Sequence, residues 1–326
     1  MIQPGQIEYL ARRFGYTESE ARFLYLIAAH SGYFFHKQYA RFLGIAPNKR
    51  TSALIKKALR HGHMVQRQPF ETENGHFKLY HLCSRRIYEI FDLGDSNLRR
   101  NGTENRAQTK VMITSFLVAH PKEAYLETES EKVEYFTQRR QIDSDVLPKQ
   151  RFRNRPDQDW IVRYFVDKFP IYLEKPDDPA NPAVVFTYFD DGLEGMQQFK
   201  AHLNAYRPLL LGLNGNCRMI YAAASDRYFE RAEACFRVAL KQELSEGKIR
   251  RYFIARSKAE AKQFGSMSRA ELADWHNGKK QYPGKFFEEL YQGWKANRTL
   301  PETMTKMMQD TLQYSGKQFE TVLITF

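Results

Sequence analysis

The residues of this chain that could bind a charged polymer gather between positions 48 and 78. Lysine and arginine neutralise phosphates, whereas asparagine, threonine and serine can hydrogen-bond to the edges of bases. In a helix that begins at Lys49, the basic residues project away from an apolar stripe that includes Leu54 and Ala58, so one face packs and the other can meet phosphate. We expect the phosphate anchors to be Lys49, Arg50, Lys56, Lys57 and Arg60, the residues near base edges to be Asn48, Thr51 and Ser52, and two further basic contacts to be Arg67 and Lys78.

The segments that must position this basic helix carry their own start and stop signals. Thr17, with Glu20 three residues later, predicts the capped start of a helix that runs to about residue 30. A second, short helix over 36–43 ends at Gly44, and a turn then leads into the basic helix. Two strands follow, and the hairpin signal Asn74-Gly75 joins 64–70 to 76–82. This order predicts a winged helix, with the third helix in the major groove and the hairpin as the wing.

Local charge favours contact with DNA over the alternative, in which the basic residues are only the solvated face of an ordinary helical domain. Residues 1–106 hold 17 Lys and Arg against 9 Asp and Glu, and the difference of +8 is most of the net +12 of the whole chain. Such a basic balance is typical of proteins that bind polyanions, and their affinity falls steeply with salt. Some winged helices bind only protein, so a protein partner for this domain also stays open.

Composition limits the other classes of protein. At 326 residues and 42% hydrophobic content, the chain can bury two cores. We expect no membrane partner, because the chain has no run of 18 apolar residues, and the N-terminus lacks the apolar core of a secretion signal. Cys83, Cys217 and Cys235 are widely spaced, which predicts neither disulfides nor a zinc cluster and fits a cytoplasmic location.

Beyond the winged helix the pattern changes to alternating strands and helices. Over 182–256 we expect strand, helix, strand, helix and strand, the last being KIRRYFIAR at 248–256, and hence a sheet with helical crossovers. The terminal FETVLITF is expected to pair as an edge strand. The predicted fold class is α+β, and the expected divisions are a winged-helix domain at 1–94, a linker at 95–109, an α/β domain at 110–256 and a mainly helical extension at 257–326.

A basic segment at 138–160 lies inside the second domain and includes Arg151 and Arg153. It reads equally well as a segment that orders on nucleic acid and as an exposed, solvated loop. Motifs of NTPases, serine hydrolases and zinc proteases are missing from the chain, so these enzyme classes are not expected.

The second domain resembles the restriction-endonuclease-like nucleases. The resemblance lies in Arg155-Pro156-Asp157, followed about 30 residues later by a hydrophobic strand that ends in Asp190-Asp191. In that family an Asp after Pro and an acid-x-Lys on the next strand bind a divalent metal and activate water. The second strand here has no acid-x-Lys. An active site would therefore need Asp157 as the first acid, Asp190 or Asp191 as the second acid and Lys200 as the base. A Mg²⁺ or Mn²⁺ cofactor is expected only if this site is active. A degenerate, silent site is the first expectation, and a nicking nuclease is the alternative.

Over residues 15–240 the chain also resembles the replication-relaxation family and, more distantly, plasmid mobilisation proteins. The resemblance rests on the winged helix, the strand KLYHL at 78–82, the Arg-Pro-Asp motif and the helix FKAHLNAY at 199–206. It implies a bacterial mobile element and a role in mobilisation, replication or transcription control. The expected partner is double-stranded DNA, with other DNA-processing proteins and a homodimer left open. A protein-interaction scaffold is the third reading.

Overall fold

The computed structural model describes residues 2–67, 70–72, 75–100, 104–153, 159–174, 182–193, 195–213, 217–240, 245–297 and 319–324. The chain folds as a mixture of helices and strands, so the expected α+β class is confirmed at this level. Residue 157, to which the first catalytic prediction refers, lies outside the described residues.

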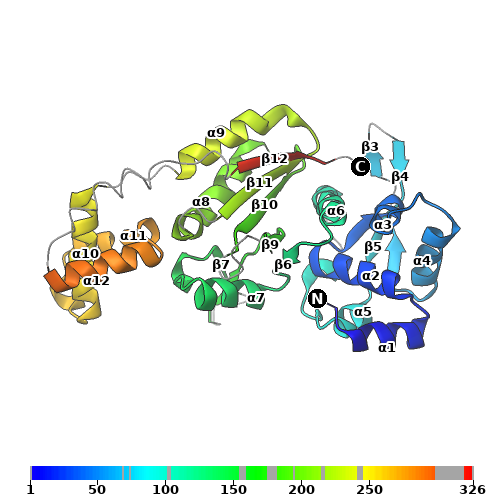
Figure 1. Ribbon diagram of the computed structural model, residues 1–326, viewed down its shortest axis with the longest axis horizontal. Coiled ribbons are helices and arrows are strands. Elements are labelled where there is room, and N and C mark those ends of the chain that lie inside the picture. Colours follow the sequence, from blue (N-terminus) through cyan, green and yellow to red (C-terminus); the bar gives the residue numbers. More distant parts are fainter. Residues whose placement is uncertain are drawn as a thin grey trace.

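The N-terminal part packs helices against a small antiparallel sheet in the order β1-β5-β2 (Figure 1). The Thr17 hydroxyl accepts a hydrogen bond from the backbone N–H of Glu20, and the Glu20 carboxylate accepts one from the backbone N–H of Thr17. The predicted capping box is therefore present. Phe23, Phe34 and Tyr39 form the middle of this core. The elements are α1 (Pro4–Phe14), α2 (Glu18–His30), β1 (Tyr33–Phe35), α3 (His36–Phe42), α4 (Lys49–Arg60), β2 (Met64–Gln66), β3 (Phe70–Thr72), β4 (Gly75–Phe77), β5 (Leu79–Leu82) and α5 (Arg85–Ile90).

Helix α6 (Glu104–Ala119) joins the N-terminal part to the second sheet, and Figure 1 shows it between the two. On one side, Thr114 donates a hydrogen bond to the backbone carbonyl of Tyr33 in β1. On the other side, Phe116 packs against the second sheet, where its ring meets Phe189. The last residues of the predicted linker, 104–109, are the first turns of this helix.

The second sheet has five strands in the order β12-β11-β10-β9-β6. Strands β10, β11 and β12 are parallel, whereas β9 pairs antiparallel with both β10 and β6. Helices α8 and α9 cover one face, where Phe199 and Phe236 pack near Tyr221, and α6 covers the other. The elements are β6 (Ala124–Tyr125), α7 (Glu129–Glu134) with a wide turn at Tyr135–Arg139, β9 (Ile171–Leu173), β10 (Val184–Asp190), α8 (Met196–Gly212), β11 (Cys217–Ala223), α9 (Phe229–Leu240) and β12 (Phe319–Leu323).

Two short strands, β7 (Lys149–Phe152) and β8 (Ile161–Tyr164), form a separate antiparallel ribbon, and neither pairs with another strand of the described residues. Strand β7 belongs to the basic segment at 138–160, for which the sequence left loop and nucleic-acid contact open, and β8 follows that segment directly.

The predicted strand at 248–256 is wrong, because these residues belong to helix α10 (Glu246–Glu260). Ile249, Tyr252 and Phe253 are spaced as one helical face and pack on the side chains of α12 (Lys285–Asn297). The third parallel strand is instead β12, as expected for an edge strand at the C-terminal end. Helix α11 (Arg269–Gln281) completes this unit. After α11 the chain passes close to α8 at Gly284 (φ +91°), where a Cβ on residue 284 would lie 2.5 Å from the carbonyl oxygen of Gly212.

No helix of the described residues combines the length and the apolarity that a membrane span requires.

Candidate nucleic-acid interface

Helix α4 presents an exposed basic stripe at the edge of the molecule (Figure 1). Lys49, Lys56 and Arg60 are exposed and follow one face of the helix, with the exposed Ala53 between them, and Arg50 lies beside the stripe. The opposite face of α4 is buried in the core and consists of Thr51, Leu54, Ile55 and Ala58. The helix is therefore fixed on one side and free to meet a ligand on the other.

The start of α4 uses polar side chains that were expected near base edges. The Asn48 side-chain oxygen accepts hydrogen bonds from the backbone N–H of Arg50 (2.8 Å) and of Thr51 (3.2 Å), so it caps the helix. The Thr51 side chain has no exposed surface, and its hydroxyl lies 2.8 Å from Nε2 of His36. The prediction that Thr51 approaches a base is wrong. Asn48 remains exposed and Ser52 half-buried, so both still lie at the surface.

Lys57 was expected to anchor a phosphate, but the structure turns it inward. Its ammonium donates to Oε2 of Glu20 at 2.5 Å and to the carbonyl oxygen of Gly15 at 2.6 Å, and it lies 5.2 Å from the centre of the Tyr16 ring. The side chain of Glu20 is only 5% exposed. Lys57 therefore compensates a buried carboxylate and stabilises the contact between α2 and α4, rather than supplying a free cation.

The hairpin β3–β4 lies next to α3. The ammonium of Lys37 on α3 sits 3.8 Å above the Phe77 ring, and Phe77 packs on Phe35 of β1. Lys78, which follows β4, is exposed, whereas Arg67 is half-buried with a guanidinium nitrogen 3.5 Å from Nδ1 of His81. Of the two basic residues expected on these strands, Lys78 is the more accessible.

The end of α4 is held by a buried histidine. His63 lies 2.8 Å from the Tyr16 hydroxyl through Nδ1, and its ring meets the edge of Phe14. Burial, with a smaller contribution from the nearby His61 and Arg86, lowers the pKa of His63 to about 4. His63 is therefore neutral near pH 7, and its Nδ1 shares a hydrogen bond with the Tyr16 hydroxyl.

Asp190 and Asp191, two of the acids considered for catalysis, are already hydrogen-bonded within the protein. The carboxylate of Asp190 accepts hydrogen bonds from the Tyr221 hydroxyl and from the backbone N–H of Gly192. Asp191 accepts from the Thr109 hydroxyl of α6 at 2.9 Å and from the backbone N–H of Leu193. These bonds fix the turn after β10 and tie it to α6.

Lys200 does not lie with these acids. It is exposed on α8, whereas the residues of α8 that line the neighbouring cavity follow another face of the helix: Gln198, Ala201, His202, Ala205 and Tyr206. A lysine two positions after Gln198 points roughly 200° away around the helix. The prediction that Lys200 replaces the missing base is therefore wrong.

A buried group that the sequence did not reveal lines the same cavity, which has a volume of about 480 Å³. Asp167, just before β9, contacts Nδ1 of His202 at 3.1 Å and accepts a hydrogen bond from the Tyr206 hydroxyl at 3.0 Å. The His202 side chain is 6% exposed, and its Nε2 is buried without a hydrogen-bond partner in the described part of the chain.

Electrostatics keep Asp167 charged. Burial opposes its ionisation, but the bonds from His202 and Tyr206 and the charge of Lys132 outweigh this effect and lower the pKa of Asp167. Burial in turn lowers the pKa of Lys132 to about 8, and the same cause lowers the pKa of Lys110 to about 8. In the described ranges, no three His, Cys, Asp or Glu residues are arranged to hold a metal ion.

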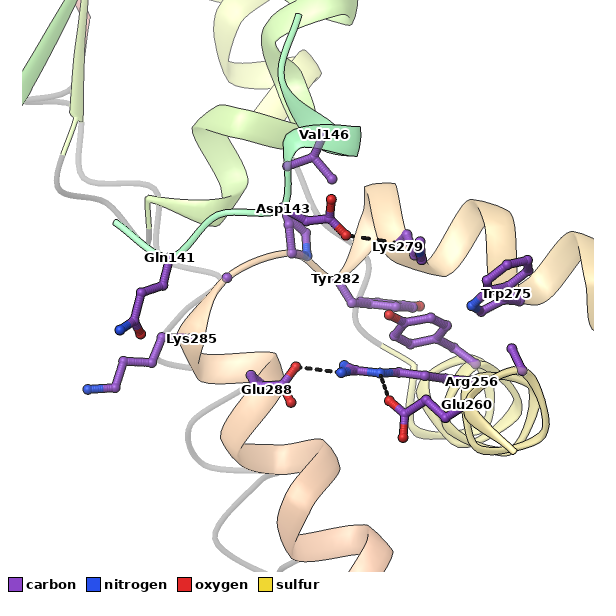
Figure 2. A pocket seen from close by; sticks show the side chains of 14 residues that line it. Gln141, Asp143, Val146, Arg256, Glu260, Trp275, Lys279, Tyr282, Lys285 and Glu288 are labelled. Carbon is purple, nitrogen blue, oxygen red and sulfur yellow. Dashed lines mark hydrogen bonds and ion pairs between the residues drawn. The ribbon is translucent and has the colours of Figure 1, made fainter. Parts of the chain in front are cut away.

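A second cavity of about 470 Å³ lies where the C-terminal helices meet the segment that contains the short turn Ser144–Val146 (Figure 2). Arg256 bridges Glu260 at 3.0 Å and Glu288 at 2.7 Å, and Lys279 lies 3.8 Å from Asp143. Figure 2 shows these charges facing one another. The cavity is thus lined by groups that already neutralise each other. The pairs of Arg256 lie within the helical unit, and the pair of Lys279 with Asp143 joins that unit to the second domain.

Comparisons of this chain with protein-family models, with curated proteins and with solved structures found no match.

Proposed function

We propose that this protein binds double-stranded DNA through helix α4, which enters the major groove while Lys49, Arg50, Lys56 and Arg60 contact phosphates. The observation that carries the proposal is the exposed basic stripe on a helix whose other face is buried core. Lysines and arginines on such a face release counterions from DNA when they bind. Thr51 and Lys57 leave the proposed contact set, because both are engaged inside the protein.

The order of elements in the N-terminal part supports the further proposal that it is a winged helix. Helices α2, α3 and α4 alternate with a sheet in which β1 pairs with β5 and β5 with β2. The hairpin β3–β4 lies between β2 and β5 in the chain and takes the position of the wing. Lys78, which follows the hairpin, is exposed and would contact the DNA backbone there.

For the second domain we propose a restriction-endonuclease-like fold with a silent site. Strand β6 pairs antiparallel with β9 and β9 antiparallel with β10, and the crossover through α8 leads to β11, which pairs parallel with β10; this order supports such a fold. The absence of catalysis is supported by the hydrogen bonds that Asp190 already accepts and by Lys200, which points away from the acids. On this reading the chain is an accessory or regulatory factor of a bacterial mobile element, acting in mobilisation, replication or transcription control.

The test is the salt dependence of duplex affinity for two charge-matched variants. Lys56→Ala/Arg60→Ala removes two charges from the α4 stripe, and Lys248→Ala/Arg250→Ala removes two exposed charges from α10, at the far end of the molecule (Figure 1). Each lost phosphate contact should lower the slope of log affinity against log salt by about 0.9, so the first variant should lose about 1.8. The second variant should keep the slope of the parent. Equal slopes in all three proteins would overturn the proposal.

A further inference from the structure

The ribbon formed by β7 and β8 presents a basic column beside an apolar column. Residues directly opposite in an antiparallel pair share one face, and Lys149 pairs with Tyr164 and Arg151 with Val162. One step further, the Arg153 guanidinium lies 5.6 Å from the centre of the Trp160 ring. On this face, therefore, cations on β7 alternate regularly and each lies beside an aromatic or aliphatic side chain of β8.

This face is open. Arg151, Arg153, Val162 and Trp160 are exposed, and 58% of Trp160 is accessible to solvent. Arg151 has no hydrogen bond or ion pair within the described ranges. A two-stranded ribbon in water is marginally stable by itself, and Trp160 and Val162 leave an apolar column of this ribbon exposed to solvent.

The base of the ribbon is anchored, so the column has a fixed direction. Glu129 at the start of α7 accepts hydrogen bonds from Arg163 and from the backbone N–H of Tyr164, both at 2.8 Å. Lys149 pairs with Asp145 at 2.9 Å, and it also lines the cavity that contains Asp167. A polymer that follows the column from Arg153 to Lys149 is therefore led to the mouth of this cavity.

We propose that this face binds single-stranded nucleic acid, with phosphates on the basic column and bases stacked on Trp160 and Tyr164. Alternate residues of a strand are about 6.8 Å apart, which is close to the spacing of successive phosphates in an extended single strand. Charge selects the ligand, because the described residues 149–153 and 160–164 include no acid. Aromatic rings beside a positive track are the usual platform for unpaired bases, whereas paired bases hide the surfaces that would stack.

The experiment measures binding of fluorescein-labelled dT12 to the full chain by anisotropy. Trp160→Ala should weaken binding roughly tenfold, and Trp160→Phe should restore most of it, since stacking needs only an aromatic face. Arg151→Gln should lower the salt slope by about 0.7. Phe152→Ala is the matched control, because Phe152 is exposed on the other face of the ribbon and its loss should leave affinity unchanged.

Trp160→Ala with the affinity of the parent would overturn the proposal, as would an equal loss in Phe152→Ala. The proposal is independent of duplex binding through α4, and the two fail separately. Lys56→Ala/Arg60→Ala should lose duplex affinity and keep dT12 affinity, and Trp160→Ala should do the reverse.

Discussion

Lys57 provides a sharp test of the structure, because sequence and structure assign it opposite roles. Lys57→Met keeps the aliphatic stem and removes the ammonium that neutralises Glu20. Glu20 would keep its bond from the backbone N–H of Thr17 but lose its ion pair with Lys57, while its side chain stays 5% exposed. Leaving a buried charged group short of a partner costs about 1–3 kcal/mol, and loss of the contact with the Tyr16 ring adds about 0.5–1 kcal/mol. The free energy of unfolding should fall by about 1.5–4 kcal/mol.

Urea unfolding of Lys57→Met and of its neighbour Lys56→Met measures this difference at equal charge. Lys56 is exposed, so its variant should unfold like the parent and lose duplex affinity instead. Glu20→Gln combined with Lys57→Met should destabilise less than the sum of the single changes, because the two groups interact directly. The reasoning is refuted if Lys57→Met unfolds like the parent and flattens the salt slope of duplex binding as much as Lys56→Met does.

Three further outcomes follow from buried groups. The pKa of His63 is lowered from 6.5 to about 4, so between these pH values the unfolded chain binds a proton that the folded chain does not. Stability should therefore fall as the pH drops from about 6.5 towards 4. In His63→Gln this fall should be weaker, as measured by urea midpoints across the same pH range. Supercoiled plasmid incubated with Mn²⁺ should be retarded on a gel and not nicked; nicking that disappears in Asp167→Asn would show that the second domain is an active nuclease. Gly278→Ala should loosen α10 from α11, because the new Cβ would lie 2.0 Å from the Tyr252 ring. Limited proteolysis should cut these helices sooner in this variant than in the control Gly293→Ala, whose new Cβ meets no atom within 4 Å.

The parts of the fold that could be predicted from sequence are those with local signals. The capping box at Thr17, the helix start at Asn48 and the period of α4 are each contained within one or two turns of helix. The strand expected at 248–256 failed because a short run with Ile, Tyr and Phe fits both periods. Its helical form is decided by side chains of α12, more than 30 residues away in the chain.

The candidate sites show the same limit more strongly. The exposed stripe of α4 follows from helical period, but the pairing of Lys57 with Glu20 joins residues 37 positions apart. Asp167 meets Tyr206 across 39 positions, and no motif in the sequence joins the two residues. Such contacts arise from tertiary packing, so a single sequence without pairing information cannot reveal them.

The central claim is that the exposed face of α4 is the surface that meets duplex DNA. Ala53 lies in the middle of the basic stripe and is exposed, so Ala53→Glu places a negative charge there without disturbing the core. A like charge at such an interface costs several kcal/mol, and duplex affinity at low salt should fall at least tenfold. Ala273→Glu introduces the same charge at an exposed position of α11 and should bind duplex like the parent. If Ala53→Glu binds duplex as tightly as Ala273→Glu, then α4 is not the DNA-binding surface.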